Sequence, residues 1–86
     1  MLIHVTSEHI RLGDKNSCTN CPIALALLEK YYDVYVSADF MQIKKQPKDY
    51  FQTLQFPKTV KTFIQKFDAG EEVFPFSFTT KAKKKL

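Results

Sequence analysis

The strongest constraint on the fold is an apolar segment that starts at Cys21-Pro22 and continues to about Tyr32. Proline suits the first position of a helix, where its missing N–H would have no partner, and Asn20 or Cys21 can cap the helix. Apolar side chains then cover most of its circumference: Ile23, Ala24, Leu25, Leu27, Leu28 and Tyr31. Because a helix that is apolar all round is buried, we expect this segment to be the centre of the core.

A second helix is predicted from Pro57. Four apolar residues recur there at i, i+3, i+4 and i+7, the spacing of one buried stripe, and Gly70 should end the helix. A third, brief helix over "SEHIRL" is expected between an N-cap at Thr6 and a left-handed Gly13, followed by a loop over residues 13–20. The stripe of the second helix is Val60, Phe63, Ile64 and Phe67, and its outward lysines are Lys58, Lys61 and Lys66.

Short strands are predicted between these helices. Residues 1–5 alternate as a strand does, and residues 34–37 and 40–44 should form a hairpin with a tight turn near Ala38-Asp39. Residues 46–56 are predicted to carry a loop and then a short strand, whose bounds the sequence leaves open.

The last predicted strand places Phe74, Phe76 and Phe78 on one face and Pro75 and Ser77 on the other. Because Pro75 cannot donate to a ladder, this strand should lie at a sheet edge. If the three rings meet the two Phe rings of the second helix, each buried ring contributes roughly 1.5 to 3 kcal/mol to stability.

Together these elements predict one α+β domain over residues 1–80, with a small, mainly antiparallel sheet of about four strands and two principal helices packed on one face. The net charge of +4 comes from the tail, because four of the thirteen Lys and Arg residues lie in 81–86 and nine remain against nine Asp and Glu. The tail is expected to be disordered and solubilising, with weak phosphate attraction as the alternative.

The sequence has no segment that resembles a membrane span or a secretion signal. Its longest apolar run, Ile23–Leu28, is far shorter than the roughly 20 residues that a membrane helix needs. Two cysteines are too few for a secreted disulfide scaffold. We therefore expect an intracellular protein with free thiols and no membrane partner.

Four residues have the composition of a zinc site. His4, His9, Cys18 and Cys21 are spaced H-x4-H-x8-C-x2-C, a Cys2His2 ligand set in reversed order. A strand and a helix would both have to direct a histidine to one point, so we favour a neutral, partly exposed histidine and a buried thiol, and keep a structural zinc module as an alternative.

The same two cysteines suggest a redox centre. Cys21 at a helix start would favour a thiolate, but a thioredoxin-like site expects the CxxC after a strand, with its first cysteine at the helix start. We therefore predict that Cys21 caps the helix and that Cys18 is buried beside it. Scattered carboxylates and only two glycines indicate no enzyme and no cofactor.

The stretch "KKQPKDYF" interleaves lysines with aromatic residues, a mixture that can bind phosphates and stack on bases or nucleotides. The favoured interpretation is a solvated loop whose aromatic rings turn inward to the core. The candidate ligand or partner contacts are Lys44, Lys45, Lys48, Tyr50, Phe51 and Arg11.

The order of the motifs "VTSEHIRLG", "CPIALAL" and "VKTFIQKFDAGEEVFPFSF" resembles a family of small uncharacterised proteins of tailed phages and prophages. The resemblance spans nearly the whole chain, and its most specific parts are residues 21–27 and 67–78. It implies that Cys21 belongs to the family pattern more securely than Cys18, and that the lysine tail is an addition. No activity comes with it, only the setting of an accessory phage protein in the host cytoplasm.

That setting favours a counter-defence factor that acts by stoichiometric binding. Its target would be a host defence protein, inhibited by contact, or a nucleotide signal held between protomers of a homo-oligomer. An exposed edge at residues 74–79 could pair with a partner strand. The alternative is a nucleic-acid-binding protein that uses the loop at residues 44–51 and the lysine tail.

Overall fold

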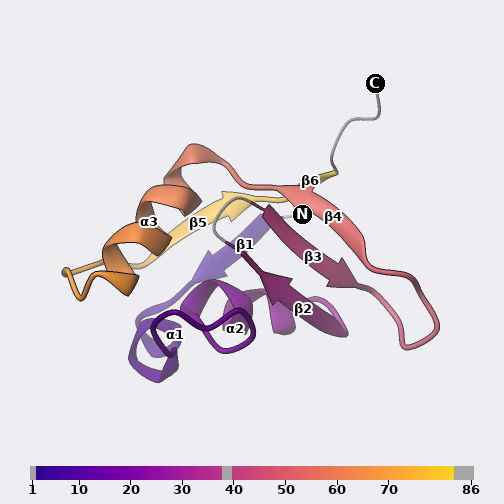
Figure 1. Ribbon diagram of the computed structural model, residues 1–86, viewed down its shortest axis with the longest axis horizontal. Coiled ribbons are helices and arrows are strands. Elements are labelled where there is room, and N and C mark those ends of the chain that lie inside the picture. The colour runs from indigo at the N-terminus through magenta and orange to yellow at the C-terminus, as the bar shows by residue number, and fades with distance from the viewer. Residues whose placement is uncertain (1, 38–39, 83–86) are drawn as a thin grey trace.

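The computed structural model of the protein describes residues 2–37 and 40–82 (Figure 1). Helices and short antiparallel strands alternate along the chain, which confirms the predicted α+β class. The elements are β1 (Leu2–Val5), α1 (Ser7–Leu12), α2 (Pro22–Leu28), β2 (Asp33–Val36), β3 (Phe40–Lys44), β4 (Gln52–Gln55), α3 (Lys58–Asp68), β5 (Phe76–Thr79) and β6 (Lys81–Ala82).

The described strands form two antiparallel sheets, one of two strands in the order β1-β5 and one of four strands in the order β2-β3-β4-β6. Only Thr80 separates β5 from β6, so one continuous segment pairs first with β1 and then with β4. The Thr80 hydroxyl lies 3.2 Å from the Tyr31 hydroxyl, which ties this crossing point to the segment after α2. The predicted single sheet is thus divided at Thr80, and its pairing extends to Ala82, two residues beyond the predicted end of the domain.

Helix α2 is the centre of the core, as its apolar circumference predicts. The side chains of Ile23, Ala24 and Leu27 are completely buried, and α2 contacts β1, β2 and α1. The helix ends at Leu28 rather than near Tyr32. A further helical turn does not form because the Tyr32 N–H donates to the carbonyl of Lys44. This hydrogen bond extends the pairing of β2 with β3.

Helix α1 is capped as expected at its start but not at its end. The Thr6 side chain accepts a hydrogen bond from the backbone N–H of His9. Gly13 is extended, with φ −73° and ψ 150°, so the predicted left-handed conformation is wrong. Glycine is required for another reason: a Cβ at Gly13 would lie 2.5 Å from Cδ of Pro22.

Helix α3 has the predicted stripe and the predicted stop. Val60, Phe63 and Phe67 are buried, and Ile64 is partly buried. After the helix, the N–H of Gly70 donates to the Phe67 carbonyl and that of Glu71 to the Lys66 carbonyl, the two bonds of a Schellman motif. Gly70 supplies the positive φ, 81°, that this motif needs.

Aromatic rings join α3 to β5. The centroid of the Phe76 ring lies 4.9 Å from that of Phe63 and 5.8 Å from that of Phe78, while Phe63 and Phe67 are 6.1 Å apart. Phe74 does not join them: it precedes β5, and 67% of its surface is exposed. The prediction that three rings of one strand meet the Phe rings of α3 therefore holds for Phe76, on which Phe78 stacks, and is wrong for Phe74.

The sheet edges at β5 and β2 are met by other parts of the chain. Strand β5 lies between β1 and α3 (Figure 1), so the edge predicted at residues 74–79 is flanked by a helix. At β2, the Val36 N–H donates to the Cys18 carbonyl and the Val34 N–H to the Asp33 carboxylate. The predicted turn at Ala38-Asp39 and the tail beyond Ala82 lie outside the described residues.

Candidate functional site

The connection between β3 and β4 is an exposed loop at the end of the molecule away from α3 (Figure 1). Lys45, Lys48 and Tyr50 are all exposed, and Tyr50 has 95% of its surface open to solvent. Phe51 is 43% exposed. The expectation that these rings turn inward to the core is therefore wrong.

The local structure explains this exposure. The period of strand β3 turns Met41 and Ile43 into the core, and a turn follows in which the Asp49 N–H donates to the Gln46 carbonyl. The residues of this turn have no buried face. We call the exposed loop, residues 44–51, the β3-β4 tip.

Lys44 and Phe51 form a cation–π pair at the base of this tip, with the Lys44 Nζ 4.9 Å from the centre of the Phe51 ring. The tip thus combines a positioned ammonium, two further exposed lysines and one free aromatic ring. Such a set can bind an anionic group and stack on a flat one. Arg11 does not belong to it, because it lies on α1 at the other end of the molecule and forms an ion pair with Glu8.

The four residues proposed as zinc ligands are engaged separately. His4 lies on the surface with its Nδ1 2.6 Å from the Ser77 hydroxyl, whereas His9 contacts Thr6 and Glu29. Within residues 2–37 and 40–82, no three His, Cys, Asp or Glu side chains are grouped so that they could hold a metal ion. The described structure therefore gives the zinc hypothesis no support.

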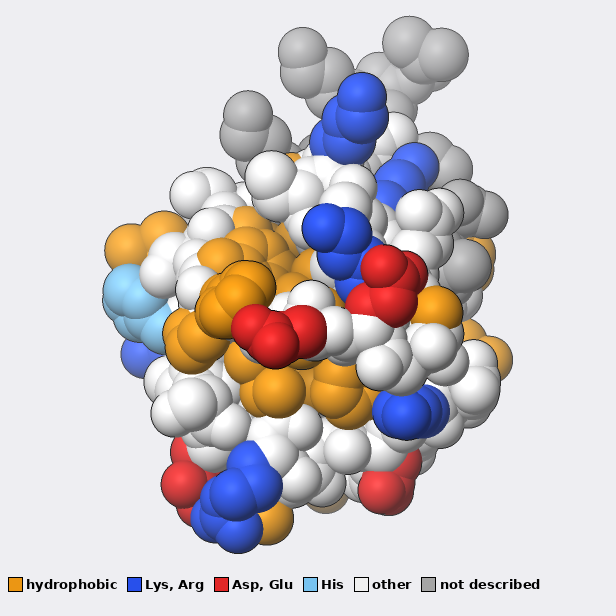
Figure 2. Space-filling view, turned by 90° about the vertical axis from the view of Figure 1, so that its left-hand side faces the viewer, with side chains coloured by type: hydrophobic (Ala, Val, Ile, Leu, Met, Phe, Trp, Pro, Cys, Tyr) orange, Lys and Arg blue, Asp and Glu red, His pale blue; other side chains and the backbone are white. Residues whose placement is uncertain are grey.

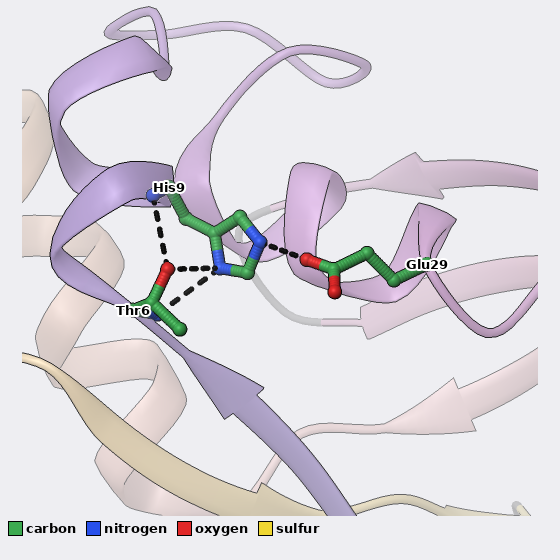
Figure 3. A network of polar contacts seen from close by, with 3 residues as sticks. All are labelled: Thr6, His9 and Glu29. Carbon is green, nitrogen blue, oxygen red and sulfur yellow. Dashed lines mark hydrogen bonds and ion pairs between the residues drawn. The ribbon is translucent and has the colours of Figure 1, made fainter.

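Thr6, His9 and Glu29 form a hydroxyl, imidazole and carboxylate sequence that superficially resembles a hydrolase triad (Figure 3). The backbone N–H of Thr6 donates to His9 Nδ1 at 3.0 Å, so this nitrogen is an acceptor and the ring proton lies on Nε2, which contacts Glu29. The Thr6 hydroxyl accepts a hydrogen bond from the backbone N–H of His9 at 3.3 Å.

The lone pair that a general base would need is therefore used to cap α1. His9 replaces the usual Glu or Gln of a capping box, and Glu29 orients its ring from 20 residues away. This network was not predicted from the sequence. The signal was present in the Thr-x-x-His pattern, but nothing in the sequence identified Glu29 as the partner.

The two cysteines have different surroundings. Cys21 is buried and is the N-cap of α2, with its Sγ accepting a hydrogen bond from the Ala24 N–H at 3.4 Å. Burial raises the pKa of its thiol, more than the backbone hydrogen bonds lower it. The predicted capping role is confirmed, and the protonated thiol is a poor nucleophile.

Cys18 is half-buried rather than buried. Its carbonyl accepts a hydrogen bond from the Val36 N–H at the edge of β2. A hydrogen bond between the Cys18 side chain and the Tyr35 hydroxyl raises the pKa of Tyr35. Both cysteines line a small hollow of about 190 Å³, together with Phe63 and Phe67.

A larger groove, which the sequence did not predict, lies between α3 and the segment 72–76. It has a volume of about 500 Å³, and Phe63, Val73 and Phe76 are among the apolar side chains that line it. Figure 2 shows hydrophobic side chains gathered at this end of the molecule, with acidic and basic side chains beside them.

These observations describe a small α+β protein with two candidate contact surfaces, the cationic and aromatic β3-β4 tip and the apolar groove beside α3. Comparisons with protein-family models, with curated proteins and with solved structures found no match for the chain. In the part of the chain that the structure describes, every helix is too short or too polar to cross a bilayer.

Proposed function

We propose that this chain is an accessory binding protein that acts by stoichiometric attachment to a protein partner, with the β3-β4 tip as its contact surface. The supporting observation is Tyr50, whose side chain is 95% exposed. Tyrosine is enriched in binding hot spots, because a rigid amphipathic ring buries a large area at a small cost in conformational entropy.

The shape of the tip favours a macromolecular partner. Small ligands bind in concave sites that enclose most of their surface, whereas Tyr50 projects from the turn and is not enclosed. The resemblance to small phage proteins suggests the setting, a counter-defence factor in the host cytoplasm whose partner is a host defence protein. Sequestration of a nucleotide signal would need a second surface that closes over the tip.

The test is to purify the tagged protein from bacteria that express a phage-defence system and to measure what it retains by native mass spectrometry. We expect a host protein in fixed molar ratio with the wild-type chain and its loss from Tyr50→Ala. Leu12→Ala is the matched control, because Leu12 is 57% exposed on α1 at the other end of the molecule. Equal retention by all three chains would contradict the role of the tip, and a retained nucleotide would favour sequestration.

A second candidate function is binding of single-stranded nucleic acid. The cation–π pair of Lys44 and Phe51, with Lys45 and Lys48 exposed nearby, supports it. Affinity for an oligonucleotide should then fall steeply as salt rises, and the slope should decrease in Lys45→Ala/Lys48→Ala and on removal of residues 83–86, which leaves β6 in place. A salt-independent affinity, or none, would exclude this function.

A further inference from the structure

We propose that a second copy of this chain occupies the groove beside α3, and that the protein forms a two-fold symmetric dimer in which Phe74 of each copy inserts into the groove of the other. The proposal concerns a different surface from the β3-β4 tip and does not depend on it. Three features of the groove support it, namely its apolar lining, the exposed Phe74 ring beside it and the distribution of charge along its two rims.

The floor of the groove is part of the aromatic cluster that joins α3 to β5. Phe63 and Phe76, whose rings are 4.9 Å apart, are both among its lining residues. The groove therefore has a rigid apolar base. Its volume, about 500 Å³, is large enough to accept an aromatic side chain.

Phe74 is an exposed aromatic residue beside this apolar base. Its ring is one of the groove's own lining residues, yet 67% of its surface is open to solvent. Pro75 follows it directly and limits the backbone conformations that Phe74 can adopt, which disfavours the αR region. The exposed ring thus lies next to a hollow of suitable chemistry, and exposed apolar area of this kind marks interaction surfaces.

The charges on the two rims identify the occupant. Lys58 and Lys66 lie on the rim formed by α3, and Glu72 lies on the rim formed by the segment before β5. A two-fold axis that runs along the groove brings the α3 rim of each copy opposite the other rim of its partner. Lysines then face glutamates twice across the interface, as an isologous contact requires.

A partner with charge of one sign would match one rim and be repelled by the other. A second copy matches both rims and supplies the aromatic ring as well. The self-complementary pattern therefore favours self-association over another apolar partner.

The test is sedimentation equilibrium of the full chain over a wide concentration range, with Lys66→Glu, Glu72→Lys and an equimolar mixture of the two. In a dimer of either variant alone, residues 66 and 72 carry the same charge and face each other at two places in the interface. We therefore expect dimer dissociation constants about tenfold or more above that of the wild type. The mixture should regain dimers, because in the heterodimer the two substituted side chains face each other with opposite charges, and the unchanged Lys66 and Glu72 do the same. Phe74→Ala should weaken the dimer by a similar or larger factor.

Circular dichroism of each variant distinguishes weak association from failure to fold, and the mixture provides a readout that loss of folding could not restore. Lys45→Glu and Asp49→Lys are the matched charge controls, because both residues lie on the β3-β4 tip, and neither should change the dissociation constant. A wild-type chain that stays monomeric at millimolar concentration would overturn the proposal. So would a mixture that associates no better than its components, as expected if a different protein occupies the groove.

Discussion

Gly13 packs against Pro22 so closely that an added Cβ would fall 2.5 Å from Pro22 Cδ. The contact joins the end of α1 to the first residue of α2 and fixes how the two helices meet. The two glycines of this chain therefore have different roles. Gly13 leaves room for the Pro22 ring, whereas Gly70 adopts a left-handed backbone conformation.

We expect Gly13→Ala to lower the free energy of unfolding by about 1–3 kcal/mol, because Pro22 cannot move without disturbing the start of α2. Gly13→Asn should cost more, since its side chain is larger. Gly70→Asn, in contrast, should be better tolerated than Gly70→Ala, because asparagine adopts positive φ more easily. Urea unfolding followed by circular dichroism measures all four. If asparagine lowered the free energy of unfolding more than alanine at both positions, or less at both, the proposed difference between the roles of Gly13 and Gly70 would be wrong.

The aromatic cluster is expected to dominate stability. Phe63→Ala removes a buried ring that packs on Phe76 and should lower the free energy of unfolding by about 3–5 kcal/mol. Phe74→Ala is the matched control within the same groove, and its effect on the unfolding of the monomer should stay within about 0.5 kcal/mol. Measurement at low protein concentration keeps self-association from contributing. A large loss from Phe74→Ala under those conditions would place Phe74 in the core.

The capping network of α1 predicts coupling between Thr6 and His9. Thr6→Ala should cost about 1 kcal/mol, and Thr6→Ser should cost less because it keeps the hydroxyl. In a double-mutant cycle, Thr6→Ala and His9→Ala should couple by about 0.5 kcal/mol or more, because each supplies one bond of the same box. Glu8→Ala, which breaks the exposed pair with Arg11, should change stability little. Additive costs would mean that the two bonds act independently.

The buried thiol of Cys21 predicts a pH dependence of stability. Its pKa is higher in the folded than in the unfolded chain, so above the ordinary thiol pKa of about 8.5 the unfolded state binds fewer protons. The stability that the neutral thiol provides is complete below that pH and is lost as the pH rises toward the folded pKa. Cys21→Ala should therefore lose less stability between pH 7 and pH 10 than the wild type, when unfolding is followed in urea. Leu12→Ala, at an exposed position on α1, serves as the control and should retain the wild-type slope.

Much of the fold could be predicted from the sequence because its signals are local. The stripe from Val60 to Phe67, proline at the start of α2 and the positive φ of Gly70 each depend on residues within a few positions. The length of α2 could not be predicted in this way. Its end depends on a hydrogen bond from Tyr32 to Lys44, twelve residues away.

The candidate surfaces were predicted only in part. The lysines and rings of the β3-β4 tip were identified from their composition, but the outward position of Tyr50 depends on the turn that the whole hairpin forms. The groove beside α3 had no sequence signal. It is lined in part by Phe74, which precedes β5 and stays exposed, although alternation alone predicted a buried ring there.

By itself, the sequence determined where the helices begin, where most of the strands lie, which faces are apolar, and that Cys21 and Thr6 cap helices, because periodicity and capping act over one or two turns. It did not reveal strand β6. Tertiary structure alone decided why position 13 must be glycine, which carboxylate meets His9, and which aromatic rings stay in solvent. Those outcomes depend on groups far apart in the chain that are brought together only when the sheets and helices of residues 2–37 and 40–82 close around one core.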